Sequence, residues 1–386
     1  MTDTVKNQVQ ERRLFSGRPQ YENFASLQRT AAVKELRPSP QPFDFPAGST
    51  IELPTTYDHE GVSKRLQKLL DDTHTSALFV LKDGAVRYER YWLTGGRGVQ
   101  WISMSVAKSF ISAMVGIAKS EGLIRNLEDP ITDYTPKLLG TAYDSVRIKD
   151  VLQMSSGARW NEDYTDPNSE IGRMSAALAA GGSYDEFMTT MVRETAPGTL
   201  CQYDSADTQA LGMLLTAATG RSITEYMQEK LTDPLGMESA GYWLVDSKGM
   251  EMAFAGLLMT ARDFAKLGEM YRNGGVWGGR QIVPADYVAA SIRSDAPHLA
   301  PGKPLVGGHA FPLGYGYQWW LPDGDHGEFS AIGVYNQYVY VDPSRGVVIV
   351  KLSANPAYGT SHRDEDNKDA ENIYGFRAIC RQFDHL

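Results

Sequence analysis

A serine and a lysine three positions apart suggest the chemistry of this chain. Ser105 and Lys108 stand where a loop gives way to a segment with helical spacing. Residues i and i+3 share one face of a helix, so the two side chains are expected to meet. A serine hydroxyl is a poor nucleophile until a base takes its proton, and a lysine amine can be that base when burial or a neighbouring charge lowers its pKa. The pair predicts a nucleophile, Ser105, and its proton acceptor, Lys108.

The pair alone also has a purely structural explanation, in which Ser105 caps a helix and Lys108 lies on the surface. A Ser-x-x-Lys pattern is expected about once by chance in a chain of this length. The residues that follow favour chemistry, because Phe110, Met114 and Ile117 form an apolar stripe typical of a buried helix. The first turn of such a helix offers free N–H groups and a positive dipole end to a developing anion.

A tyrosine and a glycine elsewhere in the chain extend this interpretation. Tyr203 lies in a turn before a predicted helix at 209–219, and a phenol can pass protons when a nearby cation stabilises its anion. It could complete a Ser-Lys-Tyr set, or it could simply pack. In the predicted strand 331–337, Gly333 leaves room for a substrate, and the N–H that follows it could face a reacting carbonyl. The alternative for Gly333 is a β-bulge.

Three other patterns have weaker functional interpretations. The acidic loop 161–167 either lies in solvent or lines a pocket that favours a substrate with an amine. The glycine-rich loop 95–98 lacks the Gly-Lys-Ser/Thr of a phosphate site. Residues 362–366, His-Arg-Asp-Glu-Asp, gather potential metal ligands, but a solvated charge cluster is the interpretation we adopt. We therefore expect no metal and no cofactor.

Composition limits the partners and the compartment. The chain has 386 residues, of which 42% are hydrophobic, so it can bury a large core. A net charge of -9 argues against nucleic acid and anionic membranes as partners. The first residues lack an apolar signal segment, no stretch reaches the length of a membrane span, and two cysteines are too few for a disulfide framework. We expect a cytoplasmic protein that acts on a small molecule and could form a homodimer.

The elements that must position these residues indicate an α+β fold. We expect a helix at 60–70, then a hairpin of strands 77–81 and 85–92 turning at Asp83-Gly84. From there to about residue 250 the patterns are mostly helical, with loops between the helices. Strands return between 314 and 352 and are followed by a final helix at 371–383. The predicted organisation is an extended arm (1–60), a sheet lobe (61–110 and 251–386) and an inserted, mainly helical lobe (111–250). The site would lie between the lobes.

The motifs together resemble a known superfamily. Ser-Val-Ala-Lys at 105–108, Tyr-Asp-Ser at 203–205 and the Gly333 strand have the order and spacing of the serine β-lactamases and penicillin-binding proteins. The tyrosine in the second motif is similar to the branch that contains class C β-lactamases, family VIII carboxylesterases and 6-aminohexanoate-dimer (nylon oligomer) hydrolases. The last group is the most similar, from about residue 20 to the end, on the stretches 104–109, 161–167, 202–206, 260–263 and 318–320.

The resemblance implies a fold and a reaction. The fold would be an antiparallel sheet flanked by helices with an inserted helical lobe. Ser105 would attack a carbonyl, Lys108 and Tyr203 would move its proton, and water would hydrolyse the acyl-enzyme. The backbone N–H groups of Ser105 and Val334 would form the oxyanion hole.

The resemblance also suggests the substrate and its contacts. Tyr164 would lie over a bound amide and Trp320 near the leaving group, with Gly333, Ser205 and Phe254 also at the substrate.

Departures from the lactamase pattern narrow the substrate class. Ser205 stands where lactamases usually have Asn, and Ile332 removes the cation that would hold a lactam carboxylate. The apolar stretch around Phe254 favours esters.

We therefore expect hydrolysis of a short linear amide, with 6-aminohexanoate dimer as the named candidate, or of an ester by a family VIII type of carboxylesterase. The alternative from another class is a non-catalytic or slowly acylating protein that binds a small molecule.

Overall fold

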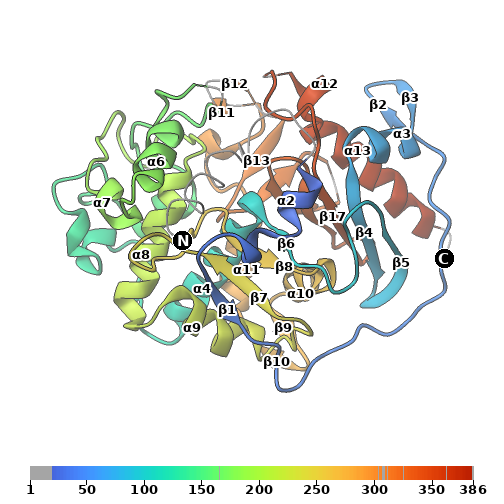
Figure 1. The fold of residues 1–386 in the computed structure, drawn as a ribbon, viewed down its shortest axis with the longest axis horizontal. Helices are drawn as coiled ribbons and strands as arrows, with labels where there is room; N and C mark the ends of the chain where they lie inside the picture. The colour runs from blue at the N-terminus through green and yellow to red at the C-terminus, as the bar shows by residue number, and fades with distance from the viewer. Residues whose placement is uncertain are drawn as a thin grey trace.

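The computed structural model describes residues 20–164, 166–302, 304–306, 309–310, 312–324, 326–361 and 363–384 (Figure 1). The first nineteen residues of the predicted arm and His362 lie outside the described residues.

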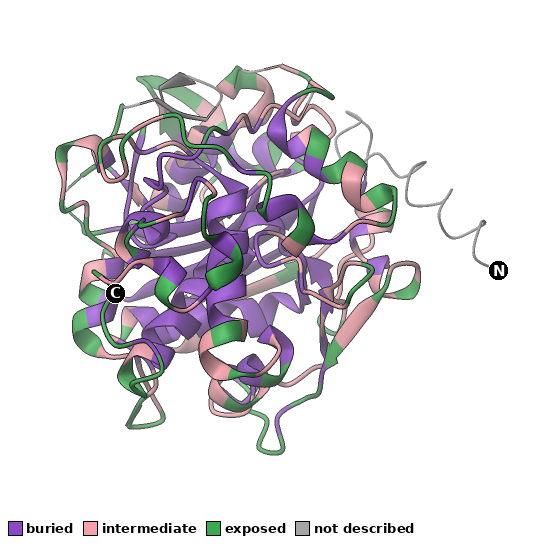
Figure 2. Ribbon diagram, turned by 90° about the vertical axis from the view of Figure 1, so that its left-hand side faces the viewer, coloured by how far each residue is buried: buried purple, intermediate pink, exposed green. Residues whose placement is uncertain are grey.

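The core of the molecule is an antiparallel sheet of seven strands within the described ranges, in the order β13-β14-β15-β16-β17-β4-β5. The strands are β4 (Thr75–Lys82), β5 (Ala85–Tyr91), β13 (Leu313–Tyr315), β14 (Trp320–Pro322), β15 (Phe329–Gly333), β16 (Gln337–Asp342) and β17 (Val347–Ser353). The predicted β4–β5 hairpin is confirmed, and β17 from the end of the chain pairs with β4 from its beginning. Figure 2 shows this sheet as a buried centre between exposed outer elements.

Alternating side chains of the central strands enter two separate hydrophobic clusters. Phe79 and Val348 belong to the cluster that contains helix α10 (Ala261–Arg272). Leu78 and Ile349 belong to the cluster that contains helices α3 (Leu66–Asp72) and α13 (Asp369–Cys380). This is the period of two that a strand buried on both faces requires. The sheet is therefore covered by helices on both sides.

The middle of the chain is mainly helical, as predicted. Helices α4 (Ala107–Ser120) and α8 (Ser205–Thr219) pack against each other. Around them lie α5 (Ile148–Leu152), α6 (Glu170–Ala179), α7 (Tyr184–Met188) and α9 (Ile223–Met227), in green and yellow on the left of Figure 1. Helix α8 begins where the Asp204 side chain accepts hydrogen bonds from the N–H groups of Ala206 and Asp207, and ends at Gly220 with φ 66°. The α+β architecture with helices around an antiparallel sheet is confirmed.

A four-stranded sheet of the described residues has the order β1-β7-β8-β6. Its strands are β1 (Val33–Leu36), β7 (Gly241–Leu244), β8 (Leu257–Met259) and β6 (Trp101–Ile102). Strand β1 lies in the segment predicted as an arm and pairs with β7. Strand β6 leads directly into the segment of Ser105, so this sheet fixes the approach to the predicted nucleophile.

The predicted helix at 60–70 is wrong in its first half. Strands β2 (Thr56–His59) and β3 (Val62–Arg65) form a hairpin there, and the helix begins only at Leu66. Glu60 and Gly61 form the turn with φ 53° and 79°, a backbone conformation that no helix tolerates. The remaining short elements are α2 (Tyr21–Phe24), α11 (Ala285–Ser291), α12 (Asp364–Asn367), β9 (Val276–Trp277), β10 (Arg280–Gln281), β11 (Pro304–Val306) and β12 (His309–Ala310).

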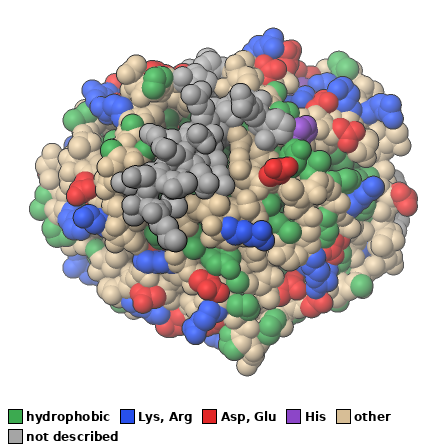
Figure 3. Space-filling model, in the orientation of Figure 1, with side chains coloured by type: hydrophobic (Ala, Val, Ile, Leu, Met, Phe, Trp, Pro, Cys, Tyr) green, Lys and Arg blue, Asp and Glu red, His purple; other side chains and the backbone are tan. Residues whose placement is uncertain are grey.

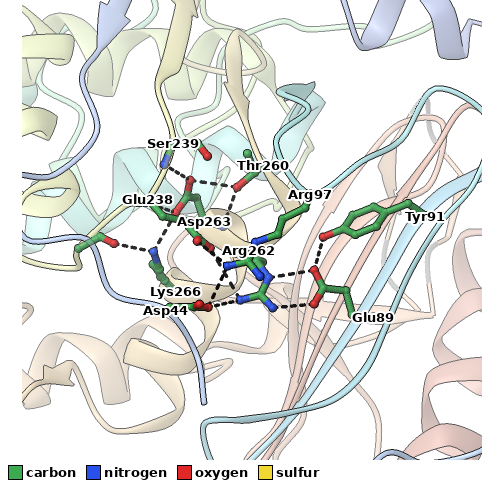
Figure 4. Close-up of polar contacts among 11 residues, drawn as sticks. Asp44, Glu89, Tyr91, Arg97, Glu238, Ser239, Thr260, Arg262, Asp263 and Lys266 are labelled. Atoms are coloured by element: carbon green, nitrogen blue, oxygen red, sulfur yellow. Dashed lines mark hydrogen bonds and ion pairs between the residues drawn. The ribbon is translucent and has the colours of Figure 1, made fainter. Parts of the chain in front are cut away.

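A network of charged side chains fastens the segment before β2 to α10 and β5 (Figure 4). Arg262 donates two hydrogen bonds to Glu89, at 2.9 and 2.6 Å, and one to Asp44 at 2.5 Å. Arg97 donates to both Asp44 and Glu238 at 3.0 Å. The guanidinium of Arg262 is buried, so its carboxylate partners satisfy a charge that has lost its water. Arg262, which belongs to the stretch 260–263, therefore has a structural role in holding these segments together.

The surface carries charges of both signs. On the face drawn in Figure 3, Lys and Arg side chains lie interspersed with Asp and Glu. Among the described residues, no helix has the length and apolar character needed to cross a membrane.

Candidate active site

Ser105 lies in a short 3₁₀ turn, Met104–Val106, directly before α4. Met104 has φ 46°, a left-handed conformation that is costly for a residue with a side chain. The turn is held in place because β6 pairs with β8 and the N–H of Ser103 donates to the carbonyl of Leu257 at 2.7 Å. The hydroxyl of Ser105 therefore stands at a constrained bend at the entrance to a buried helix.

The amine of Lys108 is surrounded by hydrogen-bonding oxygens and aromatic rings. Its Nζ lies 3.0 Å from Ser105 Oγ, 3.1 Å from Ser205 Oγ and 3.0 Å from the carbonyl oxygen of Phe254. The rings of Tyr203 and Phe254 have their centroids 5.0 and 5.5 Å from the same nitrogen. Burial lowers the pKa of Lys108 to about 8, although the charges of Glu162 and Asp204 act in the opposite direction. A lysine with this pKa can take a proton near neutral pH.

Tyr203 is buried beside the nucleophile and keeps its proton. Burial and the charge of Glu162 raise the pKa of Tyr203 well above its usual value, and a hydrogen bond with Ser105 acts in the opposite direction. Its ring stacks on Trp320 with centroids 5.2 Å apart and planes inclined by 24°. The phenol is thus oriented by packing and is suited to donate a proton rather than to accept one.

Gly333 ends β15 directly against the nucleophile's turn. A Cβ atom at Gly333 would lie 2.7 Å from the carbonyl oxygen of Ser103 and 3.0 Å from the nitrogen of Ser105. Such contacts are too short for any other residue, so glycine is required for this close approach. Val334, the next residue, lines the same cavity as Ser105. This arrangement supports, as a proposal, an oxyanion hole formed by the N–H groups of Ser105 and Val334.

Glu162 is a buried member of the site that sequence analysis did not single out. Its carboxylate accepts hydrogen bonds from Ser205 Oγ at 2.6 Å, from the N–H of Ser205 at 3.2 Å and from the hydroxyl of Tyr164 at 2.5 Å. The indole N–H of Trp160 also donates to it. Only 2% of the residue is exposed. The sequence showed an acidic loop at this place, but burial of one carboxylate depends on the path of the chain, which no local pattern gives.

The described residues form a cavity of about 820 Å³ at the nucleophile. Its walls include the predicted site residues Ser105, Tyr164, Tyr203, Trp320, Gly333 and Val334. Phe254 and Ser205, which we expected at the substrate, are not among the described lining residues. Both are buried and contact Lys108 instead, with the ring of Phe254 against Tyr184 at 5.8 Å. The structure therefore brings them to the lysine.

The outer part of this cavity is rich in acids. Glu60, Asp364 and Glu365 line it between the β2–β3 hairpin and α12. Of the basic lining residues, Lys64 is paired with Glu371 at 2.9 Å and Arg363 with Asp366 at 3.1 Å. The wall therefore favours cationic groups over anionic ones. Within the described ranges, no three His, Cys, Asp or Glu residues gather as a metal site would require.

Comparisons with known proteins identify the family of this chain. The β-lactamase family model matches residues 62–372. A 6-aminohexanoate-dimer hydrolase from Paenarthrobacter ureafaciens is 32% identical over 353 residues, covering 89% of this chain and 86% of that protein.

Solved structures share the fold. A Bacillus anthracis protein provisionally assigned as a 6-aminohexanoate-dimer hydrolase superposes with a TM-score of 0.83 at 23% identity, covering 96% of this chain and 98% of that one. A family VIII carboxylesterase superposes with a TM-score of 0.58 at 15% identity, covering 82% and 97%. The chain therefore belongs to the β-lactamase family of hydrolases, and a 6-aminohexanoate-dimer hydrolase is among its relatives.

Proposed function

We propose that the protein is a serine hydrolase that cleaves a short linear amide or ester through an acyl-enzyme on Ser105. The observation that carries this proposal is the 3.0 Å contact between Lys108 Nζ and Ser105 Oγ at the wall of an 820 Å³ cavity. The nucleophile and Gly333 belong to the predicted sheet lobe (61–110 and 251–386), and Tyr203 and Glu162 to the predicted helical lobe (111–250). The catalytic set would thus be assembled between the two lobes.

In the acylation step, neutral Lys108 takes the hydroxyl proton of Ser105 while Oγ bonds to the carbonyl carbon. The π electrons of the carbonyl move to its oxygen, which the N–H groups of Ser105 and Val334 would stabilise. Each such hydrogen bond contributes on the order of 3 kcal/mol to the transition state. The contribution of the proton transfer is about 10²–10⁴ in rate.

The intermediate then collapses and the C–N or C–O bond breaks. Tyr203 donates its proton to the leaving nitrogen or oxygen, and Lys108 returns the proton of Ser105 to the phenol. Water next attacks the acyl ester and gives up a proton to the same pair, which finally restores the hydroxyl of Ser105. One water is consumed, and the enzyme ends in its starting protonation state.

The substrate that the site supports best carries an ammonium group. The acidic outer wall favours such a group, and the relative from Paenarthrobacter ureafaciens acts, by its name, on 6-aminohexanoate dimer. Tyr164 and Trp320 both line the cavity. In our proposal Tyr164 lies over the bound amide and Trp320 lies near the leaving group.

Ester hydrolysis is the second candidate. The apolar ring of Phe254 against the lysine and the fold shared with a family VIII carboxylesterase favour it. The compartment we propose is the cytoplasm, because Cys201 and Cys380 are both buried and free. Whether two copies associate is a further proposal that the measurement of molar mass in solution would test.

The test is a steady-state assay on 6-aminohexanoate linear dimer and on p-nitrophenyl acetate and butyrate, with Ser105→Ala as the blank. Turnover of the dimer by the native protein alone would establish the amide hydrolase. Turnover of the esters without the dimer would establish the carboxylesterase. Retained activity in Ser105→Ala would refute the assignment of Ser105 as the nucleophile. If the protein turns over none of these substrates and a fluorophosphonate does not label Ser105, the alternative of a non-catalytic protein that binds a small molecule is favoured.

A further inference from the structure

The hydrogen bonds around Lys108 determine where its lone pair points. Among the described residues, three oxygens lie within 3.1 Å of Nζ, those of Ser105, Ser205 and the main chain of Phe254. A neutral amine has two N–H bonds and one lone pair. The carbonyl of Phe254 can only accept, so one N–H is directed to it. The other two neighbours are hydroxyls, and either could take the second N–H.

Glu162 removes this ambiguity. Its ionised carboxylate can only accept, and it lies 2.6 Å from Ser205 Oγ, so the proton of the Ser205 hydroxyl is directed to Glu162. The lone pairs of Ser205 then face Lys108, which donates its second N–H to them. The lone pair of the amine is left for the remaining neighbour, the hydroxyl of Ser105.

We propose that Glu162 is a positioning residue: by holding the proton of Ser205, it turns the lone pair of Lys108 toward the hydroxyl of Ser105. This inference deepens the proposed hydrolase mechanism and rests on it. Glu162 itself need not touch the reacting atoms, because it acts through Ser205 and Lys108.

The surroundings of Glu162 suit this role. The hydroxyl of Tyr164, the indole of Trp160 and the N–H of Ser205 also donate to its carboxylate, so a buried charge is held by several donors. The loop is fastened at both ends, because Gln202 donates to the carbonyl of Trp160 and Ser169 donates to the carbonyl of Asp163 at 2.8 Å. The carboxylate is therefore fixed in both charge and direction.

The charge of Glu162 also affects the proton affinity of Lys108. The titratable groups that face the amine are Glu162, Asp204 and Tyr203. Burial and the neighbouring Asp207 and Glu162 raise the pKa of Asp204 well above its usual value, and Tyr203 also keeps its proton. Glu162 is thus the main negative charge that favours protonated Lys108. Its removal should lower the pKa of the lysine.

The experiment measures the rate of phosphonylation of Ser105 by an alkyl fluorophosphonate as a function of pH, which requires no knowledge of the substrate. We compare native protein with Glu162→Gln, Ser205→Ala and the double variant. The amide of Glu162→Gln can donate to Ser205, so the proton of Ser205 is redirected to the lone pair of Lys108. In the profile of labelling rate against pH, we expect the plateau, which is the rate with fully neutral Lys108, to fall about 10–10²-fold. The acid limb, where the rate rises with pH, should move about one pH unit or more to lower pH.

The double variant tests the path through Ser205. Once the bridging hydroxyl is gone, Glu162 has no means of orienting the lysine. The plateau rate of Glu162→Gln/Ser205→Ala should therefore equal that of Ser205→Ala alone. If the plateau rate of the double variant falls by the product of the two single-variant losses, Glu162 acts independently of Ser205, and the proposal is overturned.

Control variants separate positioning from a general defect. Glu170→Gln removes another buried carboxylate of the same lobe, paired with Arg159, and should keep both the native plateau and the native limb. An acid limb that moves in Glu170→Gln as far as in Glu162→Gln would show that the loss of any carboxylate in this lobe has the same effect, and would overturn the proposal.

The remaining outcomes are also decisive. An unmoved limb with a lowered plateau in Glu162→Gln would indicate a merely structural role. If Glu162→Gln does not fold, Ser205→Ala, which keeps the carboxylate, must still lower the plateau, and a native rate in that variant would overturn the proposal. If the native protein itself is neither labelled nor active on esters or the dimer, the proposed function fails, which is distinguishable from failure of the positioning role.

Discussion

The amine of Lys108 lies 3.0 Å from the main-chain carbonyl oxygen of Phe254, a residue 146 positions later in the chain. The ring of the same phenylalanine lies 5.5 Å from that amine. One residue therefore holds the amine with its backbone and excludes water from it with its side chain. Substitutions at Phe254 change only the second effect, which makes the dehydration of the lysine separately testable.

Phe254→Ala should move the acid limb of activity to higher pH. The cavity left by the ring admits water to Lys108, and the pKa of the lysine, now lowered by burial, rises toward its usual value. Loss of the cation–ring attraction, about 0.5–2 kcal/mol, acts in the opposite direction but is partly kept by Tyr203. Rates of fluorophosphonate labelling against pH provide the measurement. Phe254→Leu, which keeps the site dry, should retain the native limb, and an equal shift in both variants would contradict the explanation.

The native protein should become active as pH rises through about 8, the pKa to which burial lowers that of Lys108. Only the neutral amine can take the proton of Ser105, so kcat/KM should fall about tenfold for each pH unit below that value. Lys108→Arg keeps a protonated side chain at every accessible pH and should lose about 10²–10⁴ in rate. A flat profile from acid to neutral pH would show that Lys108 is not the base.

Gly333→Ala should impair catalysis by displacing the nucleophile's turn. The added Cβ would lie 2.7 Å from the carbonyl oxygen of Ser103 and 3.0 Å from the nitrogen of Ser105. Loss of oxyanion geometry costs about 10²–10³ in kcat. Gly98→Ala is the matched control, because a Cβ at Gly98 meets nothing within 4 Å. Native kcat in Gly333→Ala would exclude the proposed oxyanion hole.

Arg262→Met should lower stability without changing the chemistry of the folded protein. The substitution leaves the half-buried Glu89 without its guanidinium partner, whereas the exposed Asp44 keeps Arg97, so the loss of stability should be about 1–3 kcal/mol. Arg125→Met removes an arginine whose side chain is 68% exposed and should change stability by less than about 0.5 kcal/mol. Urea unfolding measures both, and equal stabilities would refute a structural role for the network in Figure 4.

The sequence was sufficient for the parts of the site that local spacing encodes. Ser105 and Lys108 are three positions apart beside a helix, and their side chains do meet at 3.0 Å. For Gly333 the strand pattern predicts room for a substrate, whereas the groups that approach its Cα most closely in the structure are the backbone atoms of Ser103 and Ser105. Hydrophobic patterning predicted strands near both ends of the chain around a helical middle, and the family resemblance implied an antiparallel sheet flanked by helices.

What the sequence could not give depends on contacts between distant segments. Glu162 looks like any loop acid until Ser205 and Tyr164 are brought to it by the fold. The family resemblance implies that Phe254 lies at the substrate, yet its ring centroid lies 5.5 Å from the amine of Lys108 and Phe254 is not among the described residues that line the cavity. The spacing of apolar residues predicts a helix at 62–65, where the structure has a strand, because the turn at Glu60 and Gly61 depends on backbone angles rather than on hydrophobic period.

The pairing of β17 with β4 has a consequence for how the protein matures. Lys351 of β17 bonds to Thr73 beside β4, across 278 positions of chain. Contacts of such separation form late, because the loop between them must first be closed. A chain still emerging from the ribosome already contains Ser105 and Lys108 but lacks the strand that ends at Gly333. Hydrolytic activity should therefore appear only after synthesis is complete, and it serves as a reporter of the finished fold.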